Sequence, residues 1–476
     1  MKNKKKLQKQ KSFQVTTKNE KVTKIKTEKQ KKSKIAKEQQ KDAKGTEKKK
    51  REQTMQYYKM ICEQPEEKEA LVLNDKSYTY EDLQLLASKR AKVLLSKETS
   101  KIHIIRKEHI LEQLIDFLAC NAVGIIPLIM PNDCKITKEE VWQLAQNELE
   151  KIDKKTDTTK VCMAVMTSGT TGIPKIYFRT YESWAGFFGV QNDIFQVTKD
   201  SRLFTQGSLA FTGNLNLYLA QFYAGGTVIA LEAFWPKSWQ QAIEKYHANA
   251  IYLIPSKLML LPKVQKEPYK EIRMILSGSQ SLGIEDAKAL KMIYPNTEII
   301  LYYGASELNY ITYVTGQQMN EKRNLIGKAF PGVTVELKKD EFYIDTAYHV
   351  EGITTPYTLH DTGYCDTEGN FYFTGRKDDI LNIRGRKISA LKVENAFLQI
   401  DEVKEAAVKV RTHHSETILE VYVEAKEDFL ERYRQKWHNE LKKVLASYEI
   451  PRCIYVRKQL PKNDSGKIIK DKLHPD

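Results

Sequence analysis

A nine-residue loop rich in glycine and hydroxyl side chains constrains this chain more than any other segment. It reads Thr-Ser-Gly-Thr-Thr-Gly-Ile-Pro-Lys at 167–175 and directly follows the apolar run VCMAVM at 161–166. Hydroxyls donate hydrogen bonds, glycines let backbone N–H groups approach an anion closely, and a lysine adds positive charge. We therefore expect the loop to bind the phosphates of a nucleotide. Its expected ligating residues are Thr167, Ser168, Gly169, Thr170, Thr171, Gly172 and Lys175.

Two other interpretations of this loop are a Walker A loop and an ordinary surface turn. A Walker A loop needs a second glycine five positions after the first and a hydroxyl residue after the lysine, but Pro174 and Ile176 occupy those positions. A segment rich in glycine, serine and proline after a strand can also be an ordinary surface turn. The motifs described below favour the phosphate-binding interpretation over the turn.

The formal net charge of +16 is concentrated at the N-terminus. Residues 1–53 hold 21 Lys and Arg against 6 Asp and Glu, so this segment carries +15 and the other 423 residues about +1. Such a lysine-rich composition, with almost no aromatics, cannot bury enough apolar surface to fold. We expect a disordered basic tail that can contact anionic lipid or RNA. A solubilising extension, or a true start of translation at Met55, is the alternative.

The spacing of the cysteines and the apolar segments indicate in which cellular compartment the protein is expected. The six cysteines form no CxxC pair, which is typical of a reducing environment and argues against a structural zinc site. The basic start is not followed by the apolar segment of a signal peptide. The longest apolar stretch, 114–130, contains Asp116 and Asn121 and is better interpreted as a buried helix running into a strand. These features predict a cytoplasmic protein without a transmembrane segment.

Three further motifs follow the phosphate-binding loop along the chain. They are Tyr-Gly-Ala-Ser-Glu at 303–307, HDTGYCDTEGNFYFTGRKDDILNIRGRKI at 360–388, and Pro-Lys-Asn-Asp-Ser-Gly-Lys at 461–467. With the loop, they resemble the adenylate-forming superfamily, which includes acyl- and aryl-CoA synthetases, luciferases and adenylation domains of peptide synthetases. The resemblance covers 56–476 and is closest to short bacterial fatty-acid-CoA ligases.

This resemblance implies a fold of the α/β class. A large N-terminal domain of stacked α/β subdomains, which binds AMP, would span 56–375. A small mobile α+β C-terminal domain would span 376–476, with the hinge at Asp378. Within that small domain the residue pattern predicts helices at 390–399 and 428–446, and strands near 405–410, 418–424 and 453–457.

The resemblance also implies roles for residues in the N-terminal part. Glu307 would hold Mg²⁺, which suits a hard cation that prefers oxygen ligands and shares the substrate's phosphates. Asp361 would bind both ribose hydroxyls, with Arg376 as a second ribose contact. Tyr303 would stack on adenine, and Ser306 would bind the α-phosphate. The other residues expected beside adenine or AMP are Gly278, Ser279, Gly304 and Ala305.

The remaining implied roles concern the acyl group and the second substrate. Lys467 would reach the reacting carboxylate and the α-phosphate, and Arg384 and Gly385 would face the pantetheine arm of coenzyme A. Phe211 and Gly278 would border the acyl group. Phe211 stands where the family usually has a histidine, so it predicts an aromatic wall, although an ordinary core phenylalanine is an equal interpretation.

The sequence departs from the usual family pattern at three other positions. Gln280 replaces an alanine, His360 a glycine and Lys387 an arginine; at 387 the charge is kept while the bidentate geometry is lost. Adenylation domains for α-amino acids place an Asp near 208–213 to pair with the substrate ammonium. No acidic residue occurs between Gln206 and Ala230, which argues against an amino acid substrate.

The resulting functional hypothesis is ATP-dependent activation of a fatty or aryl carboxylic acid to acyl-AMP, followed by thioester formation with coenzyme A. The expected cofactors and substrates are ATP, Mg²⁺, coenzyme A and the acid. Two alternatives stay open at this point. The first is an acyl or aryl adenylase that loads a carrier protein, and the second is a non-catalytic adenylate-binding protein tethered by its basic tail.

Overall fold

In a computed structural model of the chain, residues 54–476 form one compact unit. The residues that the structure describes are 56–97, 100–154, 157–167, 174–320, 322, 324–377, 380–383, 386–413, 416–425, 429–462 and 468–475. The expected basic tail at 1–53 lies outside them, so its disorder stays a prediction.

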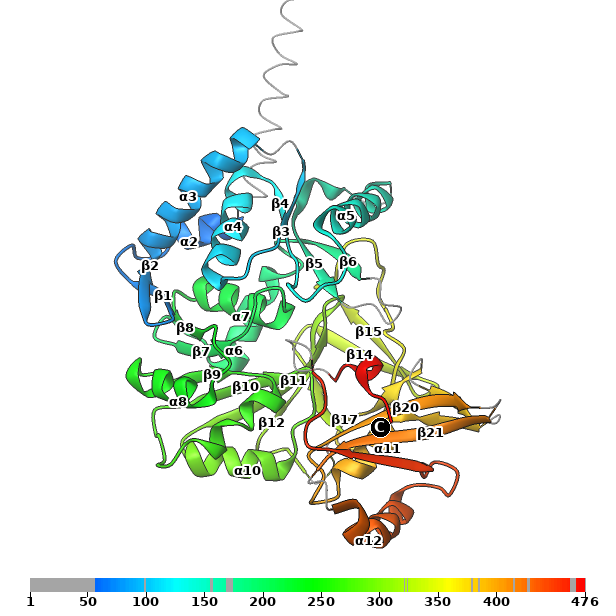
Figure 1. Cartoon of the computed structure of the whole chain (residues 1–476). Helices are drawn as coiled ribbons and strands as arrows, with labels where there is room; N and C mark the ends of the chain where they lie inside the picture. Colours follow the sequence, from blue (N-terminus) through cyan, green and yellow to red (C-terminus); the bar gives the residue numbers. More distant parts are fainter. Residues whose placement is uncertain are drawn as a thin grey trace, which may run out of the picture. The chain divides into compact units, whose positions relative to one another are not determined.

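A thirteen-stranded sheet runs through the larger part of this unit (Figure 1), in the order β14-β15-β16-β17-β13-β12-β11-β10-β9-β7-β8-β1-β2. The strands from β1 to β11 in this order are parallel, and those from β11 to β14 are antiparallel. The bounds are β1 Glu69–Leu73, β2 Lys76–Thr79, β7 Arg202–Gln206, β8 Thr227–Leu231, β9 Ala250–Tyr252, β10 Met274–Gly278, β11 Glu298–Ala305, β12 Asn309–Thr315, β13 Leu325–Ala329, β14 Val333–Lys338, β15 Glu341–Thr346, β16 Asp361–Cys365 and β17 Phe371–Arg376.

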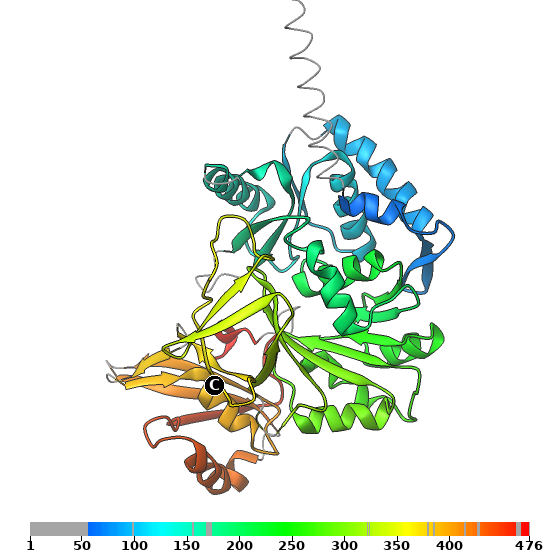
Figure 2. The same cartoon turned by 180° about the vertical axis from the view of Figure 1, so that it is seen from behind.

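Helices cover both faces of the parallel strands, as crossover connections between parallel strands require. Trp239 of α8 and Leu290 of α10 pack on one face, beside Ile251 and Ile275. Helices α6 and α7 pack on the other face. Their bounds are α6 Phe188–Phe195, α7 Thr212–Tyr223, α8 Pro236–Lys245, α9 Pro255–Leu258 and α10 Ile284–Ile293, with 3-10 turns η2 Ala185–Phe187 and η3 Leu261–Lys263. In the rear view of Figure 2, the yellow-green antiparallel strands can be followed away from the green parallel ones.

A second, four-stranded sheet has the order β3-β4-β5-β6. Its last two strands form an antiparallel hairpin in which Thr167 pairs with Lys175, so the two ends of the phosphate-binding loop lie side by side. Helix α5 packs on one face, and residues of α4 pack on the other. The bounds are α2 Gln56–Cys62, α3 Tyr80–Lys97, β3 Ile102–Ile105, α4 Ile110–Val123, β4 Ile126–Ile129, α5 Lys138–Asp153, η1 Thr158–Lys160, β5 Val161–Thr167 and β6 Lys175–Thr180.

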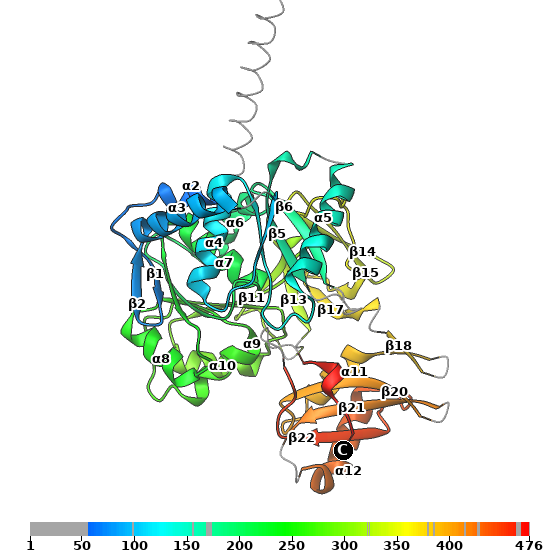
Figure 3. The same cartoon turned by 45° about the horizontal axis from the view of Figure 1, so that its top comes forward.

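The C-terminal residues build a separate core around a three-stranded sheet, β20-β21-β22, which Figure 3 shows beside α11 and α12. Val408 and Val421 face the helices with Trp437, whereas the alternate residues Ala407 and Tyr422 contact the segment near Leu460. The bounds are β18 Ile380–Ile383, β19 Arg386–Ser389, α11 Ala390–Leu398, β20 Glu405–His413, β21 Glu416–Glu424, α12 Phe429–Val444, β22 Cys453–Arg457 and η5 Lys470–Lys472.

The observed architecture agrees with the α/β class that the sequence implied, with a large sheet domain and a small C-terminal module. The predicted helices and strands of that module are confirmed, as is the helix that runs into a strand within 114–130. The domain boundary at 375/376 stays a prediction. A membrane-crossing helix is not found among the described residues, since none is both long and apolar enough.

Candidate active site

A cavity of about 230 Å³ lies beyond the carboxyl ends of the parallel strands β10 and β11. Ligands of open α/β sheets bind at such an edge, in the crevice outside the carboxyl ends of the strands. The cavity brings together nine residues that the sequence predicted for the site, from segments far apart in the chain: Thr167, Lys175, Phe211, Ser279, Gly304, Ala305, Ser306, Glu307 and Arg376.

The cavity has a carboxylate beside it that is held in place from two sides. The side chain of Asp361 is 1% exposed, and its Oδ1 accepts a hydrogen bond from Arg376 Nε at 2.7 Å. These two residues are direct partners in the β16–β17 ladder, which fixes their pairing. The hydroxyl of Tyr303 donates to Oδ2 of the same carboxylate. Burial, and next the charge of Asp361, raise the pKa of Tyr303, so it acts as a neutral donor.

Glu307 also has a fixed orientation. The hydroxyl of Tyr177, on β6, donates to Glu307 Oε1 at 2.7 Å. Burial, followed by the Glu307 charge, raises the pKa of Tyr177, so the phenol stays protonated and keeps donating. A carboxylate with one oxygen hydrogen-bonded in this way is a suitable ligand for a hard divalent cation through its other oxygen. The residues present therefore fit the Mg²⁺ assignment.

A buried arginine, which no local sequence pattern indicates, supports the backbone of this segment. Arg179 is 0% exposed; its guanidinium donates to the carbonyl oxygens of Ser306 at 2.7 Å, Ser183 at 2.7 Å and Tyr348 at 3.2 Å. Burial lowers its pKa to about 10, which leaves it charged at neutral pH. The hydroxyl of Ser306 lies 3.2 Å from that of Thr212 at the start of α7. Three residues thus position Glu307 and Ser306 although no sequence motif indicates them: Arg179, Tyr177 and Thr212.

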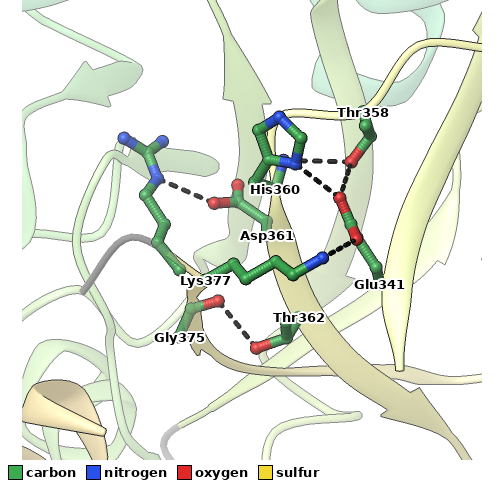
Figure 4. Close-up of polar contacts among 8 residues, drawn as sticks. Glu341, Thr358, His360, Asp361, Thr362, Gly375 and Lys377 are labelled. Atoms are coloured by element: carbon green, nitrogen blue, oxygen red, sulfur yellow. Dashed lines mark hydrogen bonds and ion pairs between the residues drawn. The ribbon is translucent and has the colours of Figure 1, made fainter. Parts of the chain in front are cut away.

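His360, which stands where the resemblance implies a glycine, has a left-handed backbone conformation. Its φ is +60°, in the left-handed region that is costly for residues other than glycine, asparagine and aspartate. The ring makes a hydrogen bond in this conformation, between Nδ1 and Glu341 Oε1 at 2.7 Å (Figure 4). Glu341 also accepts from Thr358 and from Lys377, at 2.8 and 3.2 Å. This cluster anchors both strands that carry Asp361 and Arg376.

Gly278 lies against an aromatic ring. The resemblance implied a place for Gly278 beside AMP and the acyl group, and a β-carbon at this position would lie 2.5 Å from the ring of Tyr302 on the adjacent strand. The aromatic ring therefore makes the close approach. Gly278 is not among the described residues that border the cavity, whereas Tyr302 is.

Several predicted residues lie outside the described residues, and their roles stay predictions. They are Ser168, Gly169, Thr170, Thr171 and Gly172 of the phosphate-binding loop, Asp378 of the hinge, Arg384 and Gly385 of the coenzyme A contact, and Lys467 of the last motif.

Removal of the Tyr177 hydroxyl tests the orientation of Glu307. In Tyr177→Phe, the Glu307 carboxylate loses the hydrogen bond to its Oε1 and becomes free to rotate, so the Mg²⁺ concentration for half-maximal activity should rise about 10-fold. Titration of activity with Mg²⁺ at saturating ATP measures this. Tyr343→Phe, a half-buried tyrosine of β15 that does not border the cavity among the described residues, is the control, and an unchanged Mg²⁺ requirement in Tyr177→Phe would remove Tyr177 from the site.

The Glu341 cluster predicts a pH-dependent contribution to stability. The hydrogen bond from Thr358, with His360 and Lys377, holds the pKa of Glu341 below its usual range. A carboxylate with a lowered pKa stabilises the fold above its unfolded pKa of about 4, and this contribution is lost as the pH falls through the folded pKa. The melting temperature of the wild type should exceed that of Glu341→Gln at pH 7, and the difference should shrink below pH 4. A difference that grows on acidification would contradict the ion-pair assignment.

The fold and this cavity together define a class of protein, an α/β protein with a ligand-sized cavity at the carboxyl edge of a large mixed sheet. A family model described as AMP-binding enzyme matches residues 127–352, and one described as AMP-binding enzyme C-terminal domain matches residues 392–467. The chain belongs to the AMP-binding enzyme family.

Similar proteins and structures agree with this membership. A putative long chain fatty acid-CoA ligase VraA of Staphylococcus haemolyticus is 30% identical over 324 residues, which cover 64% of this chain and 68% of the relative. The uncharacterized acyl-CoA ligase YhfT of Bacillus subtilis is 26% identical over 64% of this chain and 67% of its own length. The solved structure of O-succinylbenzoate coenzyme A synthetase (MenE) from Bacillus subtilis, in complex with ATP and magnesium ion, has a TM-score of 0.73 at 19% identity and covers 88% of this chain and 98% of MenE. This last likeness shows the shared fold.

Proposed function

We propose that the protein is an AMP-forming acid–thiol ligase that uses ATP, Mg²⁺ and coenzyme A. A carboxylate oxygen of the acid attacks the α-phosphorus of ATP, the bond to the β-phosphate oxygen breaks, and acyl-AMP and pyrophosphate form. The coenzyme A thiolate then attacks the acyl carbonyl, and AMP leaves with the carboxylate oxygen. The observation that carries this proposal is the meeting of Lys175, Glu307 and Arg376 at one cavity, with Asp361 beside it.

The chain's own residues then have the following roles. Lys175 and the loop before it bind the β- and γ-phosphates, and Ser306 binds the α-phosphate. Asp361 accepts hydrogen bonds from the ribose hydroxyls. Glu307 would hold Mg²⁺, which when bound neutralises phosphate charge. Because phosphoryl-transfer chemistry requires little covalent participation by the protein, catalysis comes from positioning and from charge stabilisation.

Lys467 completes the proposed site. It binds the reacting carboxylate and the α-phosphate during adenylation, and a rotation of residues 376–476 about Asp378 then admits coenzyme A beside Arg384 and Gly385. Tyr303, Gly304 and Ala305, at the end of β11, bind the adenine.

An ATP–pyrophosphate exchange assay with a panel of carboxylic acids tests the adenylation half-reaction. Exchange should require both an acid and Mg²⁺. Mass spectrometry of the second half-reaction then compares coenzyme A with a phosphopantetheinylated carrier protein as the acceptor, and an acyl-CoA product is expected. If only the carrier protein is acylated, the carrier and not coenzyme A is the acceptor. Binding of ATP without any pyrophosphate exchange would contradict the proposal that the protein is a ligase.

A further inference from the structure

A layer of tyrosines closes one side of the cavity. Tyr302 borders the cavity, and its hydroxyl lies 2.8 Å from the hydroxyl of Tyr252, with the two rings stacked at 6.4 Å. Tyr310 meets the Tyr302 ring edge-on at 4.5 Å. Burial raises the pKa of Tyr302 to about 12, so the layer is uncharged at neutral pH.

Two glycines show how tightly this layer is packed. A β-carbon at Gly278 would lie 2.5 Å from the Tyr302 ring, and one at Gly213 would overlap the Tyr252 hydroxyl. At both glycines, which belong to α7 and β10, the packing is too close for an alkyl chain to pass. The tyrosine layer is therefore the floor of the cavity.

Two side-chain amides that border the cavity, those of Asn216 and Asn309, have an Nδ2 without a hydrogen-bond partner among the described residues, and the amide of Asn216 lies at this floor. Asn216 is 3% exposed and borders the cavity. Its Oδ1 accepts a hydrogen bond from the Tyr310 hydroxyl at 3.0 Å, while its Nδ2 has no hydrogen-bond partner among the described residues. A buried donor without an acceptor destabilises the fold, so such a group in a native protein calls for an explanation. A ligand atom that accepts this hydrogen bond provides one.

The depth of the cavity follows from helix α7. Thr212 lies at its mouth, 3.2 Å from the hydroxyl of Ser306, and Asn216 lies one turn further on the same helix. Four residues of α-helix span about 6 Å. That distance accommodates a single aromatic ring or a short chain between the reacting carboxylate and the Asn216 amide. Phe211, which also borders the cavity, offers an aromatic wall for such a ring.

We infer that the acid substrate is a short or single-ring carboxylic acid that carries a neutral hydrogen-bond acceptor at its far end, which Asn216 Nδ2 recognises. This inference rests on the proposed function. A long-chain fatty acid has no room beyond the tyrosine floor. A second carboxylate or an ammonium group at the far end has no opposite charge there, because the charged residues that border the cavity are Lys175, Glu307 and Arg376 among the described ones, all assigned to the nucleotide and Mg²⁺.

Binding of non-reactive adenylate analogues tests this without depending on turnover. The probes are AMP and three acyl-sulfamoyladenosines, whose acyl groups are 4-hydroxybenzoyl, benzoyl and hexadecanoyl, with dissociation constants measured by calorimetry. The 4-hydroxybenzoyl analogue should bind about 10-fold more tightly than the benzoyl analogue, since one buried hydrogen bond is worth about 1.4 kcal/mol. The hexadecanoyl analogue should bind no more tightly than AMP.

The matched variants are Asn216→Leu, which removes the donor, and Asn296→Leu, which makes the same change on the exposed surface. Asn216→Leu should abolish the preference for 4-hydroxybenzoyl and keep the binding of benzoyl, and Asn296→Leu should keep the preference. The dissociation constants of the analogues for the wild-type protein test the inference even if Asn216→Leu does not fold.

The outcomes separate this inference from the proposed function. Tighter binding of the hexadecanoyl than of the benzoyl analogue would overturn the tyrosine floor and leave the ligase proposal intact. Equal binding of the two aryl analogues would overturn the role of Asn216. Failure of AMP and of every analogue to bind would contradict the proposed function itself.

Discussion

Replacement of Lys467 by alanine is expected to lower the rate of acyl-AMP formation by about 10²–10³-fold while ATP binding is retained. The reason is that this lysine is proposed to stabilise charge at the reacting carboxylate and α-phosphate, and loss of one preorganised donor of that kind typically has an effect of this size. The rate is measured by ATP–pyrophosphate exchange, and ATP binding by calorimetry on the same samples.

Lys472→Ala is the matched control, because Lys472 is an exposed lysine five residues further along the chain. It should exchange pyrophosphate at the wild-type rate. Unchanged exchange in Lys467→Ala would remove this lysine from the mechanism, and parallel losses of exchange and ATP binding would assign it to nucleotide binding instead.

Replacement of Asp361 by asparagine is expected to raise the KM for ATP about 10²-fold and to leave the KM for the acid nearly unchanged. Asparagine keeps the shape but replaces one acceptor oxygen by a donor, so the carboxylate no longer satisfies both Arg376 and Tyr303. Truncation or neutralisation of one partner in a buried, charged hydrogen bond costs about 2–5 kcal/mol in binding. The half-exposed Arg376 can turn to water, which favours the lower part of that range.

Asp366→Asn supplies the control for this prediction. Asp366 lies at the turn of the same β16–β17 hairpin and accepts hydrogen bonds from Asn370 and Tyr372. It does not border the cavity among the described residues, so the KM for ATP should stay within about twofold. An equal rise in both variants would mean that the hairpin, and not the Asp361 carboxylate, determines ATP affinity.

Periodic and local features of the fold could be predicted from the sequence. The alternation in 405–424 and the helical spacing in 428–446 identified β20, β21 and α12, because a half-buried strand and an amphipathic helix repeat their apolar residues at different intervals. The departure at His360 was also visible as a side chain where glycine is usual. Its φ of +60° and its ion pair with Glu341 required coordinates.

Contacts between distant segments could not be predicted. The order of the thirteen-stranded sheet depends on pairings such as β13 with β17, for which no local pattern exists. Arg179 reads as a charged residue in a short strand, yet it is fully buried because three carbonyl oxygens converge on it from separate segments. The pairs Tyr177–Glu307 and Tyr310–Asn216 span 130 and 94 residues, so motif spacing says nothing about them.

Transfer of isotope from the acid to AMP tests the central claim most directly. The enzyme is incubated with Mg²⁺, ATP, coenzyme A and the acid that gives the fastest pyrophosphate exchange, with both carboxylate oxygens labelled as ¹⁸O. If the carboxylate attacks the α-phosphorus and the thiol then attacks the carbonyl, the AMP should carry one ¹⁸O atom in its phosphate and the pyrophosphate none. Formation of ADP and phosphate, or of AMP without label, would contradict an adenylate-forming reaction.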